Sequence, residues 1–345
     1  MTHFTDYRDY CRHLITTRRR DYLLGDSATQ QAILHANLPF EYKPPTATKQ
    51  AVLLIHGLYD SPCMMHSLSA VFIHENYLVR SILLPGHGTC PEDLLLVTYQ
   101  DWLSACRVAI ELLPTTIERI VIAGFSTGAL ISHYLALQNE IPRLAGLVAI
   151  APALQLHRLE RLLLNNRFII QIAKKLSPWT CQTKVYDYAK YSQHALNGAV
   201  QVQRLIQQCP DRVCSLPVFW VLSASDSVID SKALWQRFQT NQANPQSRCF
   251  IYSSTPLTFA NDPRIIVRSS YYPEQSIINF SHICLTVAPD HPHYGCTGDY
   301  TLNSNASAKR PLILGERGGK STARLTYNPD FTYMAHAIQK FLKNL

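Results

Sequence analysis

The chain has 345 residues, of which 47% are hydrophobic and 16% are charged. This composition excludes a disordered chain and predicts an ordinary globular protein with a large buried core. The formal net charge is +8, but the basic residues are scattered apart from Arg18, Arg19 and Arg20, so we expect no nucleic-acid partner.

At the N-terminus, residues 1–10 are polar and lack the apolar stretch of a secretory signal. No later run reaches the ~18 consecutive apolar residues that span a bilayer. We therefore expect a cytoplasmic protein without a transmembrane segment. Residues 1–48 predict a polar, irregular lead-in with a helix near residues 6–24, which ends at the Pro44-Pro45 break.

From residue 49 the pattern alternates between continuous apolar strands and amphipathic helices. Strands are predicted at residues 51–56, 77–84, 119–123 and 144–151, and helices at residues 62–76, 99–113 and 127–138. Apolar strands separated by such helices are typical of a mostly parallel sheet with helices on both faces. The sequence thus predicts an α/β fold.

The alternation stops at residues 152–216, where helical patterns at 159–176 and 197–209 occur without a convincing strand. We interpret this segment as an inserted helical cap. The alternation resumes with strand 217–224, helix 231–240 and strand 248–253, and it closes with helix 329–342. Residues 285–328 predict an extended loop. We therefore expect one domain at residues 49–345.

The strand at 119–123 runs directly into Gly124-Phe125-Ser126-Thr127-Gly128, and a helix follows. This is the strand, turn and helix context of the G-x-S-x-G nucleophile elbow. The turn holds the serine in a strained conformation, and glycine on both sides avoids clashes with the neighbouring strand and helix. Ser126 is therefore the predicted nucleophile.

A serine hydroxyl needs a base to take its proton and a carboxylate to orient that base. With this elbow the chain order is Ser, then Asp or Glu, then His. Asp226 follows the strand at 217–224, at the same sheet edge as Ser126, and is the predicted acid. Asp230 is its rival, although it is better placed to cap the next helix. His282, after an apolar stretch, is the predicted base.

The oxyanion of a tetrahedral intermediate needs backbone N–H donors. Thr127, directly after the nucleophile, and Leu58, after the first strand of the alternation, are the predicted donors. His56, at the end of that strand, is interpreted as a structural residue.

Two further histidines, His291 and His293, lie in a proline-rich loop. With Asp290 or Asp299 they would suit a metal ion, but we favour a loop that faces solvent or the cap.

Further motifs occur in the order of a known family. They are His56-Gly57-Leu58 with Ser61-Pro62, Leu84-Pro85-Gly86-His87-Gly88-Thr89, Pro91-Glu92-Asp93-Leu94, Asp101-Trp102, the elbow, Asp226 with Val228, and Ser281-His282. Over residues 50–285 and the closing helix, the chain resembles the α/β-hydrolase superfamily and, within it, microbial monoacylglycerol lipases and carboxylesterases.

The resemblance implies an α/β-hydrolase fold with a triad of Ser126, Asp226 and His282. It also implies an oxyanion hole at Leu58 and Thr127, and a lid over an acyl pocket. The chain departs from the family pattern at Ala129, where many relatives have glycine, and in the long extension after His282.

These features predict a serine hydrolase that cleaves carboxylic esters through an acyl-enzyme. Short or medium acyl esters, monoacylglycerol and lysolipid-like molecules are the expected substrates, with no cofactor and no metal. The apolar pattern at 159–176 predicts a segment that lines an acyl pocket or contacts a membrane peripherally. The alternative is that this segment only covers the sheet. A thioesterase or peptidase is an alternative because the same triad cleaves other acyl groups, and so is a non-catalytic binding protein on this fold.

Overall fold

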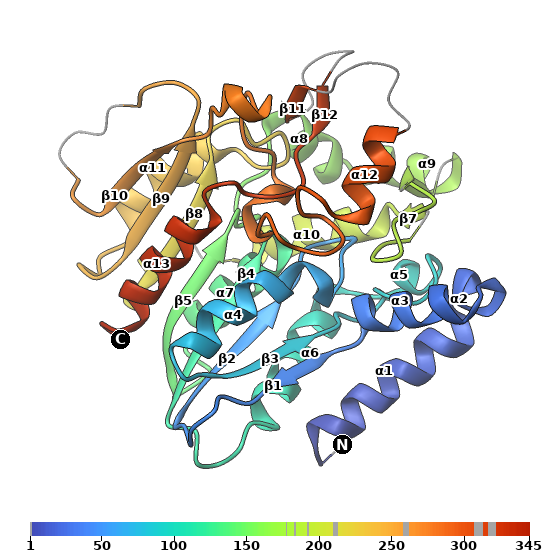
Figure 1. Cartoon of the computed structure of the whole chain (residues 1–345), viewed down its shortest axis with the longest axis horizontal. Helices are drawn as coiled ribbons and strands as arrows, with labels where there is room; N and C mark the ends of the chain where they lie inside the picture. Colours follow the sequence, from blue (N-terminus) through green and yellow to red (C-terminus); the bar gives the residue numbers. More distant parts are fainter. Residues whose placement is uncertain are drawn as a thin grey trace.

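The computed structural model describes residues 2–176, 178–182, 184–191, 193–209, 213–257, 262–306, 313–316 and 322–345. Its centre is an eight-stranded sheet in the order β1-β3-β2-β4-β5-β8-β9-β10 (Figure 1). β1 pairs antiparallel with β3, and every other neighbouring pair is parallel. The strands of this sheet are β1 Phe40–Tyr42, β2 Gln50–Ile55, β3 Leu78–Ile82, β4 Arg119–Phe125, β5 Leu144–Ile150, β8 Val218–Ser223, β9 Arg248–Ser253 and β10 Ile265–Ser269.

Helices cover both faces of the sheet. Successive side chains of a strand point to opposite faces, so neighbouring residues of one strand contact different helices. Phe219 of β8 packs on Phe341 of α13 (ring centroids 5.6 Å apart), whereas the next residue, Trp220, packs on His133 of α7 (5.9 Å) and Phe238 of α11 (5.6 Å). The helices are α1 Phe4–Arg18, α2 Arg20–Leu24, α3 Ser27–Asn37, α4 His66–His74, α5 Asp93–Leu96, α6 Tyr99–Glu111, α7 Thr127–Gln138, α8 Arg158–Asn165, α9 Arg167–Leu176, α10 Asn197–Gln208, α11 Ser231–Asn241, α12 Asp299–Ala306 and α13 Phe331–Leu342, with short 3-10 turns η1 Pro62–Met65, η2 Pro273–Gln275 and η3 Ile283–Thr286. The predicted parallel sheet between two helical layers is confirmed.

The N-terminal segment is more regular than the lead-in that the sequence predicts, and the helix predicted near residues 6–24 is present as α1 and α2. It forms α1, α2 and α3, and it contributes β1 to the sheet. The helix α1 buries Phe4, Tyr7, Cys11 and Ile15, which lie three or four residues apart on one face. This narrow apolar stripe stabilises the helix although most of its residues are polar. The predicted domain boundary at residue 48 stays a prediction.

The insert between β5 and β8 contains more elements than the sequence predicts. The single helical pattern at 159–176 is divided into α8 and α9, because the side chain of Asn166 accepts hydrogen bonds from the backbone N–H groups of Phe168 and Ile169 and starts a new helix there. A two-stranded antiparallel sheet of β6 Trp179–Gln182 and β7 Gln193–Ala195 follows before α10. The cap boundaries at 152 and 216 stay predictions.

The described part of the C-terminal extension is also partly regular. It forms α12 and a parallel pair of β11 Ile313–Gly315 and β12 Thr322–Arg324, and it lies beside α8 and α9 above the carboxyl ends of the strands (Figure 1). Within the described ranges, no helix is long and apolar enough to cross a membrane.

Candidate active site

The elbow has the backbone strain that its motif predicts. β4 ends at Phe125 and α7 begins at Thr127, so Ser126 alone forms the turn between them. Its φ of 53° and ψ of −112° lie in a region that L-residues rarely adopt. A Cβ at Gly124 would lie 2.3 Å from the backbone of Gly128, and a Cβ at Gly128 would lie 2.1 Å from the carbonyl oxygen of Ile55. Both glycines are therefore required for steric reasons.

Three side chains from distant parts of the chain meet at this turn. Nε2 of His282 lies 3.0 Å from Oγ of Ser126, and Nδ1 of His282 lies 2.6 Å from Oδ2 of Asp226. All three residues are buried, with exposed fractions of 7% for Ser126, 6% for Asp226 and 5% for His282. These distances are those of a nucleophile, a base and an orienting acid in hydrogen-bond contact.

Asp226 is fixed by its own loop. Its Oδ1 accepts hydrogen bonds from the N–H groups of Val228 (2.8 Å) and Ile229 (3.0 Å), which leaves Oδ2 for His282. Asp230 instead accepts from the N–H of Ala233 and caps α11, as its position predicts. The structure thus brings Asp226, and not its rival, to the histidine.

A fourth side chain, Glu316 of the extension, connects the loops of the acid and the base. Its buried carboxylate accepts hydrogen bonds from the N–H of His282 (3.0 Å) and the N–H of Ser227 (3.4 Å). Sequence reasoning missed Glu316, since neither its spacing nor a motif connects it with residues so far away in the chain.

The loop after β2 is held by two neutral histidines. Nε2 of His56 accepts a hydrogen bond from the N–H of Leu84 (3.0 Å), and Nε2 of His87 accepts from the N–H of Tyr59 (3.1 Å). Burial lowers the pKa of His56 well below its usual value and lowers the pKa of His87 to about 4. Both rings therefore act as uncharged acceptors, in agreement with the structural role predicted for His56.

The N–H groups of Leu58 and Thr127 are available to a ligand. Neither donates a hydrogen bond within the part of the chain that the structure describes, and both residues line the same cavity as Ser126. Their positions, after β2 and at the first residue of α7, are those from which two donors can reach one oxygen.

A cavity of about 1000 Å³ opens over Ser126 and His282. Its walls come from the sheet edge, the insert and the extension. The apolar part of its lining is Leu58, Ala153, Leu156, Leu164, Ala199, Val202, Val228, Ile283, Leu314, Ala323 and Leu325. This cavity is large enough for a drug-sized molecule, and its apolar walls suit an acyl chain.

Comparison with known proteins places the chain in a family. The family model described as "Serine aminopeptidase, S33" matches residues 46–255, which is more than half of the chain. The chain belongs to this family of α/β hydrolases. A thermostable monoacylglycerol lipase of Bacillus sp. (strain H-257) is 31% identical over 105 residues, which cover 30% of this chain and 41% of the lipase. The aligned segment thus spans less than half of that relative.

Solved structures of other α/β hydrolases share the fold. The structure of Est1E from Butyrivibrio proteoclasticus with bound ferulic acid has a TM-score of 0.53 and 12% identity, over 89% of this chain and 94% of that one. A monoglyceride lipase from Saccharomyces cerevisiae, in complex with a substrate analogue, has a TM-score of 0.51 and 13% identity, over 63% of this chain and 82% of that one. At these identities the likeness concerns the fold alone.

The α/β-hydrolase family match ends before the extension, where His291 and His293 lie. Nδ1 of His291 accepts from the N–H groups of His293 and Tyr294, and its Nε2 lies 3.8 Å from Sγ of Cys63. His293 contacts carboxylates of the insert and of α12. Among the described residues, no group of three or more His, Cys, Asp or Glu is arranged to hold a metal ion.

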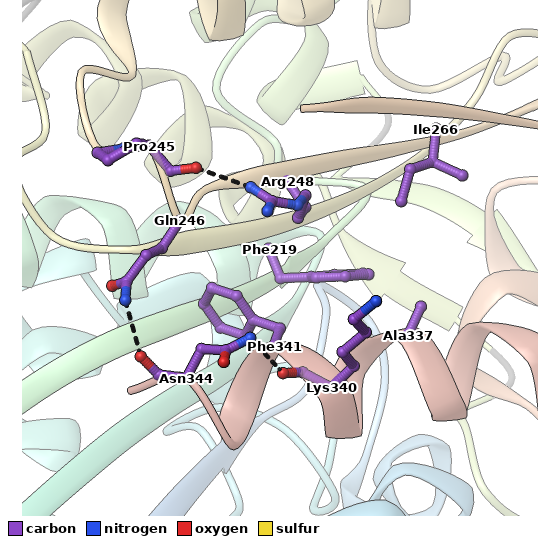
Figure 2. A pocket seen from close by; sticks show the side chains of 9 residues that line it. All are labelled: Phe219, Pro245, Gln246, Arg248, Ile266, Ala337, Lys340, Phe341 and Asn344. Carbon is purple, nitrogen blue, oxygen red and sulfur yellow. Dashed lines mark hydrogen bonds between the residues drawn. The ribbon is translucent and has the colours of Figure 1, made fainter. Parts of the chain in front are cut away.

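A second pocket of about 390 Å³ lies far from the elbow of this α/β hydrolase (Figure 2). It is formed by α13 and by the amino-terminal ends of strands β8, β9 and β10, whereas Ser126 lies at their carboxyl-terminal edge. Its lining is Phe219, Pro245, Gln246, Arg248, Ile266, Ala337, Lys340, Phe341 and Asn344. With no nucleophile and no histidine in this lining, it is not a candidate active site.

Proposed function

We propose that this α/β hydrolase cleaves carboxylic esters with Ser126 as nucleophile. The observation that carries the proposal is the hydrogen-bonded series of Ser126, His282 and Asp226 at the floor of a partly apolar cavity. Oγ of Ser126 attacks the ester carbonyl while Nε2 of His282 takes its proton. His282 then protonates the leaving alcohol and activates the water that hydrolyses the acyl-enzyme.

The remaining site residues have supporting roles in this proposal. The N–H groups of Leu58 and Thr127 donate to the oxyanion of each tetrahedral intermediate. Asp226 keeps the proton of the neutral imidazole on Nδ1, so that Nε2 is free to accept from Ser126. The family is described as that of a serine aminopeptidase, whereas the similar Bacillus protein is a monoacylglycerol lipase, so the acyl bond that is cleaved has to be measured.

Matched p-nitrophenyl esters and p-nitroanilides of increasing acyl length test the proposed reaction. We expect the esters to be hydrolysed, with an optimum at short or medium chains, and the anilides to be cleaved far more slowly. A higher kcat/KM for anilides would indicate a peptidase, and preferential hydrolysis of acyl thioesters would indicate a thioesterase. If the folded protein cleaves none of them, the proposed function is wrong.

Glu316 is expected to act as a positioning residue. In Glu316→Ala, the loops of Asp226 and His282 lose their shared acceptor, and we expect kcat to fall about 10-fold to 100-fold with little change in KM. Glu316→Gln retains an acceptor oxygen and should recover most of kcat. Glu274→Ala, which removes an exposed carboxylate, is the control. Equal kcat in Glu316→Ala and wild type would contradict this role.

We further propose that α8 and α9 contact an anionic lipid surface. Leu162, Phe168 and Leu176 are exposed to 58%, 71% and 82%, and Arg167 and Lys175 are exposed beside them. An exposed apolar surface with a basic border is typical of helices that lie on membranes. Leu164 of α8 lines the cavity over Ser126, so the same helix pair connects this surface with the proposed acyl pocket.

Phe168→Asp is expected to weaken binding to phosphatidylserine-containing vesicles about tenfold, because a large apolar side chain is no longer inserted. Sedimentation with vesicles measures this change. Val267→Asp is the control, since Val267 is 39% exposed on the edge strand β10, away from α9 (Figure 1). Equal losses in both variants, or binding only to neutral vesicles, would argue against membrane contact through the cap.

A further inference from the structure

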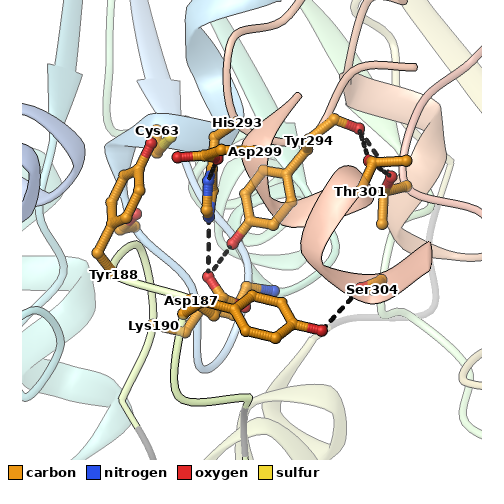
Figure 3. Close-up of polar contacts among 12 residues, drawn as sticks. Cys63, Asp187, Tyr188, Lys190, His293, Tyr294, Asp299, Thr301 and Ser304 are labelled. Atoms are coloured by element: carbon orange, nitrogen blue, oxygen red, sulfur yellow. Dashed lines mark hydrogen bonds and ion pairs between the residues drawn. The ribbon is translucent and has the colours of Figure 1, made fainter. Parts of the chain in front are cut away.

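The lining of the cavity over Ser126 includes a set of polar residues, and we call this part of the cavity the polar lobe. Its walls are residues 184–190 of the insert, which we call the cap segment, together with α12 and β12 of the extension. Figure 3 shows how side chains of the cap segment and of the extension face one another there. The polar lining of this lobe is Lys184, Asp187, Lys190, Tyr294, Tyr300, Thr301, Ser304, Asn305 and Arg324.

One oxygen of each carboxylate in and behind this lobe accepts from a fixed donor. Oδ1 of Asp187 accepts from the hydroxyl of Tyr294 (2.6 Å) and lies 3.3 Å from Nε2 of His293 (Figure 3). Oδ1 of Asp60 accepts from the N–H of Ser61 (3.0 Å). Glu316 accepts from two backbone N–H groups, as described above.

The cationic side chains of the lobe donate few hydrogen bonds within the described residues. Nζ of Lys190 donates no hydrogen bond within the described residues, and the nearest carboxylate oxygen, Oδ1 of Asp60, is 3.7 Å away. The Lys190 side chain is nevertheless only 16% exposed. In the described part of the chain, Nζ of Lys184 donates only to Oγ of Ser304 (3.0 Å). Nε of Arg324 has no hydrogen-bond partner there and lies 3.5 Å from Glu316. Each of the three cations therefore keeps N–H groups that donate to no acceptor among the described residues.

Hydrogen bonds from Arg19 and Asn37 fix the backbone of the cap segment around Lys190. The guanidinium of Arg19, which is 1% exposed, donates to the carbonyl oxygens of Tyr188 and Lys190, each at 3.0 Å. Asn37 donates to the same carbonyl of Tyr188 (3.1 Å). Because Arg19 and Asn37 fix this backbone, an anion that binds Lys190 meets a preorganised donor.

A largely shielded ammonium group with unused donors favours an acceptor-rich partner, since charge-assisted hydrogen bonds replace the lost hydration. We propose that Lys184, Lys190 and Arg324, here called the basic lobe, bind an anionic group that the ester substrate carries outside its scissile bond. Phosphate and carboxylate share this chemistry. The inference rests on the proposed esterase function, and it narrows the substrate class to anionic esters.

The position of the basic lobe supports the view that a single substrate molecule contacts both Ser126 and the basic lobe. Both line the same cavity. Asp60, the acid nearest to Lys190, lies two residues after Leu58, the proposed oxyanion donor. In this proposal, one ester binds within this cavity with its carbonyl at Ser126 and its anionic end at Lys190.

Two substrate pairs test the proposal and separate the sources of the anion. The first pair is 1-decanoylglycerol and 1-decanoylglycerol 3-phosphate, both below their micellar concentrations. The second pair is p-nitrophenyl butyrate and p-nitrophenyl hemiglutarate, in which a carboxylate ends the acyl chain. We expect wild type to prefer the anionic member of at least one pair, and the preferred pair identifies the part of the substrate that carries the anion.

Substitution of Lys190 then tests the donor itself. In Lys190→Met, the ratio of kcat/KM for the anionic ester to that for the neutral ester should fall about 10-fold to 100-fold, as expected for a charge-assisted hydrogen bond. Lys190→Arg should restore much of the ratio. Lys184→Met, on an exposed side chain, should lower it less and serves if Lys190→Met does not fold. Lys232→Met, exposed on α11, is the matched control.

Binding measured without turnover separates this inference from the esterase function. In the Ser126→Ala background, calorimetry with 1-decanoylglycerol 3-phosphate should show binding that Lys190→Met weakens. If binding follows this pattern but no ester is cleaved, the proposed function fails and the anion site stands. Equal losses for both members of each pair in Lys190→Met, or no anionic preference in wild type, would overturn the inference.

Discussion

Replacement of Ser126 by alanine is expected to lower kcat for the best ester by a factor on the order of 10⁴ or more, because the acyl-enzyme can no longer form. The substitution removes one oxygen from a residue that is 7% exposed. The fold and the cavity should therefore be retained. KM should change little, since the proposed binding contacts remain.

Ser61→Ala is a matched control for this experiment. Ser61 is also buried, and its hydroxyl has no hydrogen-bond partner within the described residues. We expect Ser61→Ala to keep a kcat close to that of wild type. A kcat for Ser126→Ala that stays near the wild-type value, in a variant that unfolds at an unchanged temperature, would refute the role of Ser126.

Asp226→Asn is expected to lower kcat about 10⁴-fold, an effect comparable with that of the same change in other serine triads. The amide retains the shape of the side chain, so the loop from Val228 to Ile229 should stay in place. Its effect arises because an uncharged amide neither fixes the Nδ1–H tautomer of His282 nor stabilises the imidazolium.

Asp230→Asn supplies a stringent control, because Asp230 was the rival acid in the sequence. Asparagine caps helices about as well as aspartate, so this variant should retain both stability and activity. Steady-state kinetics of the two variants compare them directly. If Asp230→Asn is the one that loses activity, the acid has been assigned to the wrong residue.

The elbow could be predicted because its requirements are local. Strain at Ser126 and close contacts at Gly124 and Gly128 arise within the turn and its neighbouring elements. The G-x-S-x-G motif therefore contains the residues that this geometry requires. The acid and the base were predictable for a different reason. Parallel strands place their carboxyl ends at one sheet edge, so the end of the strand before Asp226 pointed to that residue. His282 was predicted from the chain order of the triad and from the apolar stretch before it.

The polar part of the cavity could not be predicted in the same way. Glu316 contacts residues 34 and 89 positions away, and Arg19 contacts the cap segment 169 and 171 positions away. Such contacts leave no periodic pattern in a single sequence. The N-terminal helices were underestimated for a related reason, since their apolar stripe is narrow and becomes visible only against the core.

The walls of the cavity differ in how they are fixed. The cap segment is held by Arg19 and Asn37 of the N-terminal segment and by Tyr294 of the extension. By contrast, α8 and α9 expose most of their large apolar side chains. This difference suggests that the polar wall is rigid, whereas the proposed lipid contact belongs to the outer helices of the cap.

Intact-protein mass spectrometry after reaction with a fluorophosphonate tests whether Ser126 is an activated nucleophile. We expect a single adduct on the wild-type chain, located at Ser126 by peptide mapping, and no adduct on folded Ser126→Ala. A folded wild-type protein that remains unlabelled, or an adduct that persists in Ser126→Ala, would contradict this role of Ser126.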